Sequence, residues 1–166
     1  MAGEAIPGRR RILLERKYRT TIDRLWDLWT TKNGIELWWG PEGFEVSVAE
    51  LDLRPGGKLK FTMTAVGQEQ IEALKKAGLS LAVDARATYT VVEKKRRLGF
   101  KTVADFIPGV EPYEVETIVD FVIERDEVLM LVSFDPMHDE VWTERQRMGR
   151  ESELARLDLI LSWPRQ

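Results

Sequence analysis

The sequence contains no cysteine and only one histidine. Without cysteine the chain can form no disulfide, thiolate metal centre, iron–sulfur cluster or cysteine nucleophile. A metal site built on His138 would need several carboxylates as its other ligands, and no His-x-x-x-His or Glu-x-x-His spacing occurs. We therefore predict that the protein has no metal and no cofactor. The lack of cysteine is compatible with a reducing compartment.

Long apolar runs and a strong charge imbalance are also missing. No segment reaches membrane-spanning length, and the first eleven residues lack the apolar centre of a signal peptide. The net charge is −3, from 25 basic and 28 acidic side chains, so there is no bulk electrostatic attraction to nucleic acid or to an anionic membrane. We predict a cytoplasmic protein that neither binds nucleic acid nor inserts into a membrane.

Recognisable catalytic motifs are scarce. No glycine-rich phosphate loop opens a helix, and no Gly-x-Ser-x-Gly sequence occurs. His138 is the one catalytic candidate, and it lies next to Asp139 and Glu140 near the start of a predicted helix. Two interpretations stay open: His138 faces solvent, or it acts as an acid or base at the mouth of a pocket.

Tryptophan, in contrast, is concentrated in one short segment. Four of the six tryptophans, Trp26, Trp29, Trp38 and Trp39, fall within fourteen residues. Each can bury roughly 150 to 250 Å² of surface, which is more than a short helix needs in order to dock. The cluster therefore belongs either to a core or to the wall of a cavity.

The hydrophobic pattern predicts strands separated by tight turns, followed by a long helix. Alternating apolar residues indicate strands at 12–20, 44–53, 59–65, 89–92, 98–104, 113–123 and 128–134, with a bulge at Ala49-Glu50. Helical spacing indicates helices from Thr20 to Asn33, at 35–39, at 68–77 and from Asp135-Pro136 to about Ser162, the last stopped by Pro164. Thr20 and Asp23 have the spacing of a capping box.

The long helix presents two apolar sets that together predict a broad buried face. One set is Val141, Trp142, Met148, Ala155 and Leu159, and the other is Leu154, Leu157 and Leu161. Successive hairpins and a single terminal helix predict an α+β fold in which an antiparallel sheet curls around that helix. The length suits one domain, residues 11–163, after a flexible tail at residues 1–10.

Three sequence elements, in this order, resemble a known family. They are Leu37-Trp38-Trp39-Gly40-Pro41, the segment Asp52 to Leu59 with its Arg-Pro-Gly-Gly turn, and a terminal helix that contains Trp142. The chain from about Arg10 to Trp163 resembles the domain of the activator of Hsp90 ATPase, in the START-like (SRPBCC, Bet v 1-like) helix-grip superfamily. The resemblance implies a seven-stranded antiparallel sheet that grips the C-terminal helix, with two short helices after the first strand.

The resemblance also implies a cavity between the sheet and the helix for a lipid, polyketide or aromatic molecule. Thr102 and Thr117 place hydroxyl groups among the apolar residues of two predicted strands. Each hydroxyl either donates to a neighbouring backbone carbonyl or orients a ligand. Gly149 either allows close packing on the sheet or leaves room for a bound molecule. The candidate ligand-binding residues are Trp38, Trp39, Phe61, Met63, Tyr89, Phe100, Thr102, Thr117, Phe121, Trp142 and Gly149.

Other functions stay open beside ligand binding. One is a protein-interaction or stress-response module related to Hsp90 co-chaperones, and another is an enzyme acting on an apolar substrate in the same cavity. The founding activator carries an additional N-terminal domain, and residues 1–11 do not supply it, which argues against direct chaperone stimulation. Helix-grip domains often dimerise, so a homodimer stays open. The helix at 68–77 extends beyond a minimal domain of this kind and is a candidate lid.

Overall fold

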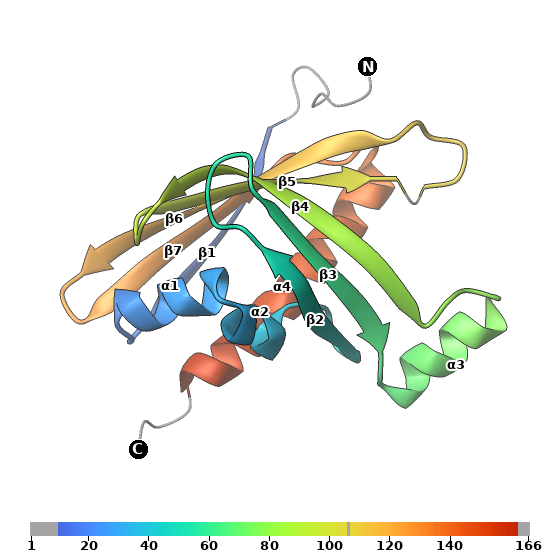
Figure 1. The fold of residues 1–166 in the computed structure, drawn as a ribbon, viewed down its shortest axis with the longest axis horizontal. Helices are drawn as coiled ribbons and strands as arrows, with labels where there is room; N and C mark the ends of the chain where they lie inside the picture. The colour runs from blue at the N-terminus through green and yellow to red at the C-terminus, as the bar shows by residue number, and fades with distance from the viewer. Residues whose placement is uncertain (1–9, 106, 163–166) are drawn as a thin grey trace.

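The computed structural model describes residues 10–105 and 107–162, which form one antiparallel sheet and four helices (Figure 1). The strands are β1 (Ile12–Tyr18), β2 (Phe44–Leu51), β3 (Lys58–Ala65), β4 (Ala82–Glu93), β5 (Arg97–Ala104), β6 (Tyr113–Glu124) and β7 (Glu127–Phe134). The helices are α1 (Ile22–Thr30), α2 (Lys32–Trp38), α3 (Gln68–Lys76) and α4 (Glu140–Ser162). The predicted α+β helix-grip architecture is confirmed. The predicted tail, apart from Arg10, and Pro164 lie outside the described residues.

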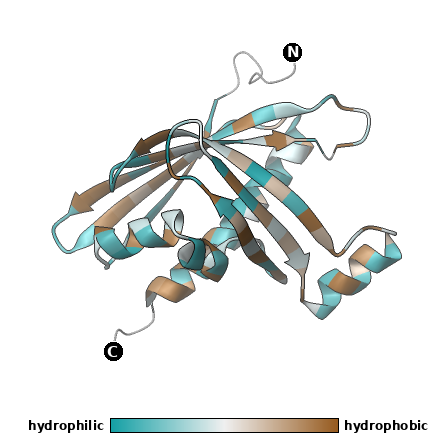
Figure 2. Cartoon of the chain, viewed as in Figure 1, coloured by the Kyte–Doolittle hydropathy of each residue, from teal (hydrophilic) through white to brown (hydrophobic). Residues whose placement is uncertain are grey.

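The seven strands are ordered β1-β7-β6-β5-β4-β3-β2. Every neighbouring pair is antiparallel. The first two strands lie at opposite edges because α1 and α2 carry the chain from one edge to the other, and α4 crosses behind the curled sheet in the view of Figure 1. Along the strands hydrophobic and hydrophilic residues alternate (Figure 2), so the sheet has an apolar and a polar face.

Two predicted irregularities of the sheet are present. The register of β2 against β3 shifts between Val48 and Glu50, which confirms the bulge. The Arg-Pro-Gly-Gly turn joins the same strands, and Gly56 has a φ of +85°, a value that favours glycine. A Cβ on Gly57 would lie 2.0 Å from the carbonyl oxygen of Asp52, so a larger residue would force the turn open.

The two short helices begin and end at different residues from those predicted. The hydroxyl of Thr21, not Thr20, caps α1 by accepting the amide hydrogen of Arg24. The chain then breaks at Thr31, whose hydroxyl accepts the amide hydrogen of Gly34 and caps α2. The prediction that Asn33-Gly34 ends the first helix was therefore wrong, because a threonine cap starts the second helix two residues earlier.

The clustered tryptophans pack in the core between the short helices and the sheet. Trp29 and Trp38 are 2 % exposed, and their ring centroids are 4.6 Å apart in an edge-to-face arrangement. The indole N–H of Trp38 donates to the carbonyl of Leu28 at 2.7 Å. Trp39 extends the cluster to the sheet, with ring centroids 5.4 Å from Phe61. The cluster thus fixes α1 and α2 against the sheet.

Helix α4 is packed along only part of its length. Leu154 and Leu157 are buried, whereas Val141, Met148 and Leu159 are each at least 60 % exposed. The predicted broad apolar face was therefore wrong in part, because much of the first apolar set faces outward. Near its C-terminal half, α4 contacts α2 and β1. None of the described helices is long and apolar enough to cross a membrane.

Candidate functional site

A cavity of about 1070 Å³ lies between the sheet and the N-terminal half of α4. Strands β3 and β4 contribute Phe61, Met63 and Ala85 to its wall, and β5 and β6 contribute Thr102 and Val115. The remaining lining residues are Ala49, Lys60, Thr62, Val83, Asp84, Arg86, Val103, Ala104, Asp105, Met137, Trp142, Arg145, Gln146 and Arg150. The cavity wall is therefore mostly apolar, with charged groups both on the sheet side, from Lys60, Asp84 and Arg86, and on the helix side, from Arg145 and Arg150.

The helical wall of the cavity comes from residues spaced along one face of α4. Trp142, Gln146 and Arg150 are separated by four residues each, so they project from the same side of the helix. The indole of Trp142 packs on a second apolar cluster that includes Met137 and Tyr113. The guanidinium of Arg145 lies 4.7 Å from the centre of the same indole ring. One face of α4 thus supplies both the apolar and the polar parts of the helical wall.

Arg150 is the polar group that stands out on this wall. Its Nη2 donates to the hydroxyl of Thr117 at 2.5 Å. Its guanidinium lies 5.3 Å from the ring centre of Phe134 and 5.8 Å from that of Phe100. Burial lowers the pKa of Arg150 from its ordinary value, and the negative charge of Glu153 partly opposes this shift. Arginine nevertheless stays protonated at neutral pH, so a partly buried cation lines the cavity.

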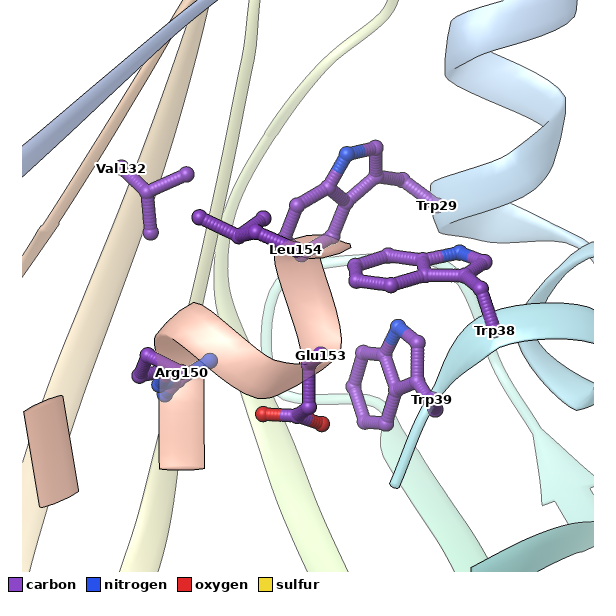
Figure 3. Close-up of a pocket in the computed structure, with 7 residues that line it drawn as sticks. All are labelled: Trp29, Trp38, Trp39, Val132, Arg150, Glu153 and Leu154. Carbon is purple, nitrogen blue, oxygen red and sulfur yellow. The ribbon is translucent and has the colours of Figure 1, made fainter. Parts of the chain in front are cut away.

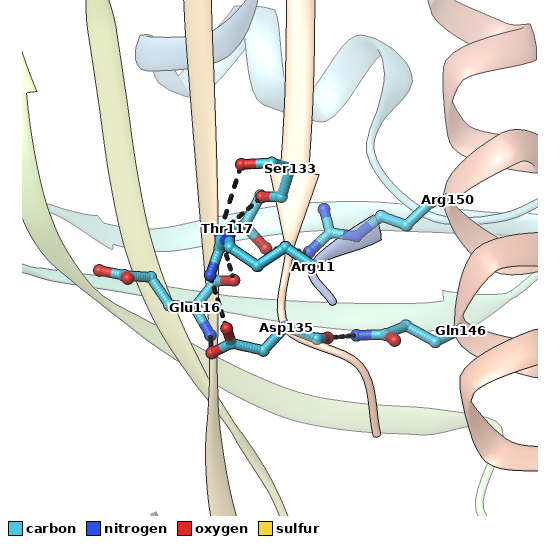
Figure 4. Close-up of polar contacts among 7 residues, drawn as sticks. All are labelled: Arg11, Glu116, Thr117, Ser133, Asp135, Gln146 and Arg150. Atoms are coloured by element: carbon cyan, nitrogen blue, oxygen red, sulfur yellow. Dashed lines mark hydrogen bonds and ion pairs between the residues drawn. The ribbon is translucent and has the colours of Figure 1, made fainter. Parts of the chain in front are cut away.

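A polar network behind the cavity holds the surrounding elements in place (Figure 4). The carboxylate of Asp135 accepts two hydrogen bonds, from Nη1 of Arg11 at 2.5 Å and from the backbone N–H of Glu116 at 2.9 Å. The backbone carbonyl of Asp135 accepts a hydrogen bond from Nε2 of Gln146 at 3.1 Å. The other amide atom of that side chain, Oε1, is buried without a partner among the described residues. This network ties β1, β6 and β7 to α4 beside Arg150.

A second, much smaller pocket of about 20 Å³ lies on the other side of Arg150 (Figure 3). Trp29, Trp38 and Trp39 form its apolar side, and Glu153 and Leu154 of α4 complete it with Val132. A water molecule needs roughly 10 to 15 Å³ of such volume, so this pocket suits a water and not an organic ligand. Arg150 therefore separates the packed tryptophan core from the larger cavity.

The loop after α2 is held in place from α4. Nη1 of Arg156 donates to the carbonyls of Trp39, Gly40 and Phe44 at 3.2, 3.0 and 2.8 Å. The carboxylate of Glu153 accepts the amide hydrogen of Gly40 at 3.1 Å. Gly40 has a φ of +93°, so this turn of the Trp-Trp-Gly-Pro segment favours glycine. The segment thus has a structural role in this chain, as a loop fastened to the final helix.

A model of the activator of Hsp90 ATPase homolog 1-like protein family matches residues 19–161, most of the chain. The chain belongs to this family. The family lies in the SRPBCC, Bet v 1-like superfamily, whose members commonly bind hydrophobic ligands. No curated protein matches the chain.

Several solved structures share the fold of this family member. A protein of Chromobacterium violaceum is 17 % identical, with a TM-score of 0.73 over 94 % of this chain and all of that one. The AHSA1 protein of Silicibacter pomeroyi is 18 % identical, with a TM-score of 0.71 over 92 % and 98 % of the two chains. CalU16 from Micromonospora echinospora is 21 % identical, with a TM-score of 0.64 over 97 % and 83 %. At these identities the likeness shows the fold alone.

The structure distributes the predicted ligand-binding residues between three places. Phe61, Met63, Thr102 and Trp142 line the large cavity, whereas Trp38 and Trp39 line the small pocket. Tyr89, Phe100, Thr117 and Phe121 are buried in the core and do not line either. For Thr117, the hydroxyl accepts a hydrogen bond from Arg150.

Gly149 occupies neither of the environments proposed for it. A Cβ built on Gly149 would meet nothing within 4 Å, so close packing on the sheet does not explain this glycine. It is also absent from the residues that line the cavity. Nothing in the structure explains why a glycine stands at this position.

His138 lies just before α4, outside the cavity wall. Its Nδ1 is 2.8 Å from the hydroxyl of Tyr113, and its Nε2 is 3.3 Å from Oδ2 of Asp139. The same tyrosine hydroxyl accepts the backbone amide hydrogen of His138 at 3.0 Å. The side chain is 25 % exposed, so it neither faces solvent freely nor lines the cavity. These contacts hold the chain at the entry to α4.

Helix α3, the candidate lid, lies at the far end of β3 and β4 and extends away from the sheet (Figure 1). None of its residues is buried, and none lines the cavity. The side chain of Gln70 is close enough to Gly43 and Gly67 that a Cβ on either glycine would meet it. The chain that leaves α3 enters β4 at Ala82, next to the cavity residues Val83–Arg86, so α3 is connected to the wall without forming it.

Sequence reasoning missed Arg150. The available signal was its spacing from Trp142, four residues at a time on one helical face. Charged side chains on a terminal helix are usually solvated. For this reason Arg150 was not considered as a candidate ligand-binding residue. Only the three-dimensional arrangement brings Arg150 together with Thr117 and Phe134, far from it in sequence.

Proposed function

We propose that this protein binds a hydrophobic small molecule, of lipid, polyketide or aromatic type, in the cavity between the sheet and α4. The observation that carries the proposal is the cavity itself, about 1070 Å³ in volume with a mostly apolar wall. Ligand sites in proteins are typically roughly 300 to 1000 Å³ and mostly apolar, with few polar groups. The ligand chemistry common in the family supports the same conclusion.

The driving force for binding is burial of the ligand against apolar side chains. Met63 and Trp142 line the cavity and are only partly buried, so they keep surface that a ligand would cover. Each square ångström of apolar surface removed from water contributes about 25 cal/mol. His138, the sole histidine and the one catalytic candidate from the sequence, does not line the cavity, whereas the carboxylates of Asp84 and Asp105 do. The apolar wall supports binding, and it is binding that we propose.

The proposal is tested by filling the cavity. Ala85 lines it, whereas Ala82 on the same strand is exposed and does not. We expect Ala85→Phe to weaken binding of Nile red, a neutral dye that fluoresces in apolar surroundings, by about tenfold, since roughly 50 Å² of lost contact corresponds to about 1.3 kcal/mol. Ala82→Phe is the matched control and should bind the dye as the unmodified protein does.

Fluorescence titration with the dye, followed by displacement with decan-1-ol, measures the affinities. Native mass spectrometry of the purified protein then shows whether a small molecule is retained and how many subunits are present. If the dye binds neither form, or binds Ala85→Phe and the unmodified protein equally, the cavity is not a ligand site and the proposal fails.

A further inference from the structure

We propose that the ligand is an amphipathic carboxylic acid whose carboxylate binds the guanidinium of Arg150 while its apolar tail lies along the sheet. This inference rests on the proposed function and specifies the chemistry of its ligand. It is carried by Arg150, one of four cationic side chains that line the cavity, by the N–H groups of Arg150 that remain available, and by the apolar side chains on the rest of the wall.

The charge of Arg150 has no ion-pair partner within the described residues. Thirteen ion pairs are formed among these residues, and none includes Arg150. Its one hydrogen bond goes to a neutral hydroxyl, that of Thr117. Placing a charge in a partly buried position without a counterion is unfavourable. An anion in the cavity would supply the missing counterion.

Two of the neighbouring acids, Glu153 and Asp84, have hydrogen-bond partners of their own. The negative charge of Glu153 acts on the pKa of Arg150, but its carboxylate accepts the amide hydrogen of Gly40. Asp84, on the sheet side, accepts the hydroxyl hydrogen of Thr62 at 2.7 Å. Asp105 lines the cavity as well, and the helix adds a second cation, Arg145. The helical wall is therefore cationic, although the chain as a whole carries a net charge of −3.

Arg150 also retains the donors that a carboxylate requires. A guanidinium has five N–H groups, and the hydrogen bond to Thr117 uses a single terminal nitrogen. None of its nitrogens is fully buried and unsatisfied, and the residue lines the cavity. Arginine and carboxylate pair through two parallel hydrogen bonds. The rings of Phe100 and Phe134 hold the guanidinium plane in place from the sheet side.

The rest of the cavity suits an apolar tail. From Arg150 the wall continues to Thr102 and Val115 and then to Phe61, Met63 and Ala85. A molecule with a charged end and an uncharged chain would match both parts of the cavity. A purely apolar molecule would leave the guanidinium unpaired, and a cationic one would be repelled by it.

The test compares three ligands that share one tail: decanoate, decan-1-ol and decylammonium. We expect the unmodified protein to bind decanoate at least about tenfold more tightly than decan-1-ol, in line with the strength of charged hydrogen bonds, and decylammonium most weakly. Isothermal titration calorimetry at neutral pH measures all three. Arg150→Met should abolish the preference for decanoate over decan-1-ol, while Arg150→Lys should retain part of the preference.

Arg147→Met is the matched control, since Arg147 lies on the same helix, pairs with Glu144 and does not line the cavity. This variant should keep the full preference. Equal binding of decanoate and decan-1-ol by the unmodified protein would overturn the inference, even if Arg150→Met did not fold. Nile red binding with no preference for the acid would remove only the head-group inference, whereas no binding of dye or ligands would remove the proposed function as well.

Discussion

The two halves of α4 differ in what they contact. Around Leu154 and Leu157 the helix is buried against the tryptophan core and β1. From Glu140 to Gly149 no residue is buried, and Trp142 and Gln146 line the cavity, Trp142 being only partly buried against a small apolar cluster. Arg150 marks the boundary, because it lines both the small pocket and the large cavity.

The difference shows how one helix can serve both stability and binding. At the packed end, tryptophans from α1 and α2 occupy the space between helix and sheet. At the open end no such helix intervenes, and the sheet presents small residues such as Ala85 and Ala104 beside Phe61. The volume that the tryptophans take up at one end is therefore left free at the other. Protein interiors are otherwise close-packed, so a volume of this size suggests a role in binding.

The largest effect should come from the packed end. Leu157 has no exposed surface, so Leu157→Ala should lower the free energy of unfolding by about 2 to 5 kcal/mol. Met148, on the same helix, is 61 % exposed, and Met148→Ala should change it by less than about 0.5 kcal/mol. Urea unfolding followed by circular dichroism measures both. Equal losses of stability in the two variants would show that α4 is packed uniformly, and the contrast between its two halves would then be wrong.

A smaller effect should appear at Tyr89, in the core under the packed end. Its hydroxyl is buried without a partner among the described residues, and burial raises the pKa of Tyr89 to about 12. Because this folded-state pKa exceeds the ordinary value of about 10, the tyrosine ionises first in the unfolded chain, and the folded protein loses stability as the pH rises from about 10 through about 12.

Tyr89→Phe removes this ionisation. At neutral pH the variant should be as stable as the unmodified protein or up to about 1 kcal/mol more stable, because an unpaired buried hydroxyl is removed. Above about pH 10 it should lose less stability, by up to about 2 kcal/mol. Urea unfolding at both pH values measures the difference. A marked loss of stability at neutral pH would mean that the hydroxyl has a partner after all.

The smallest effect on stability is expected at the open end. Trp142 is partly buried on the cavity wall. Trp142→Ala should weaken binding of decan-1-ol by about tenfold, or roughly 1.4 kcal/mol, while changing the free energy of unfolding by about 1 kcal/mol or less. Calorimetric titration and urea unfolding give the two numbers. A loss of stability comparable to that of Leu157→Ala would assign Trp142 to the packed core instead.

Much of the fold followed from local patterns in the sequence. Alternation placed the strands, and the bulge in β2 and the Arg-Pro-Gly-Gly turn were visible because each breaks the alternation in a characteristic way. Cap positions were less predictable. Thr20, Thr21 and Thr31 carry the same hydroxyl, and only the hydrogen bonds in the structure distinguish the two that cap helices.

The candidate site was predictable only in part. Phe61, Met63 and Trp142 line the cavity, whereas Phe100 and Phe121, which share the same alternation, are buried in the core. Strand periodicity identifies the face of the sheet on which a side chain lies. It carries no information about whether a helix or a tryptophan covers that face at a given point along the strand.

The sequence by itself determined which residues form strands and helices and which side of each strand is apolar, because these depend on neighbours a few positions away. The tertiary structure alone decided where the apolar faces meet closely and where they stand apart. That outcome depends on how α1, α2 and α4 share the concave surface of the sheet. The same packing places Arg150 beside Thr117 and, within residues 10–105 and 107–162, without an ion-pair partner, since residues from distant parts of the chain set its surroundings.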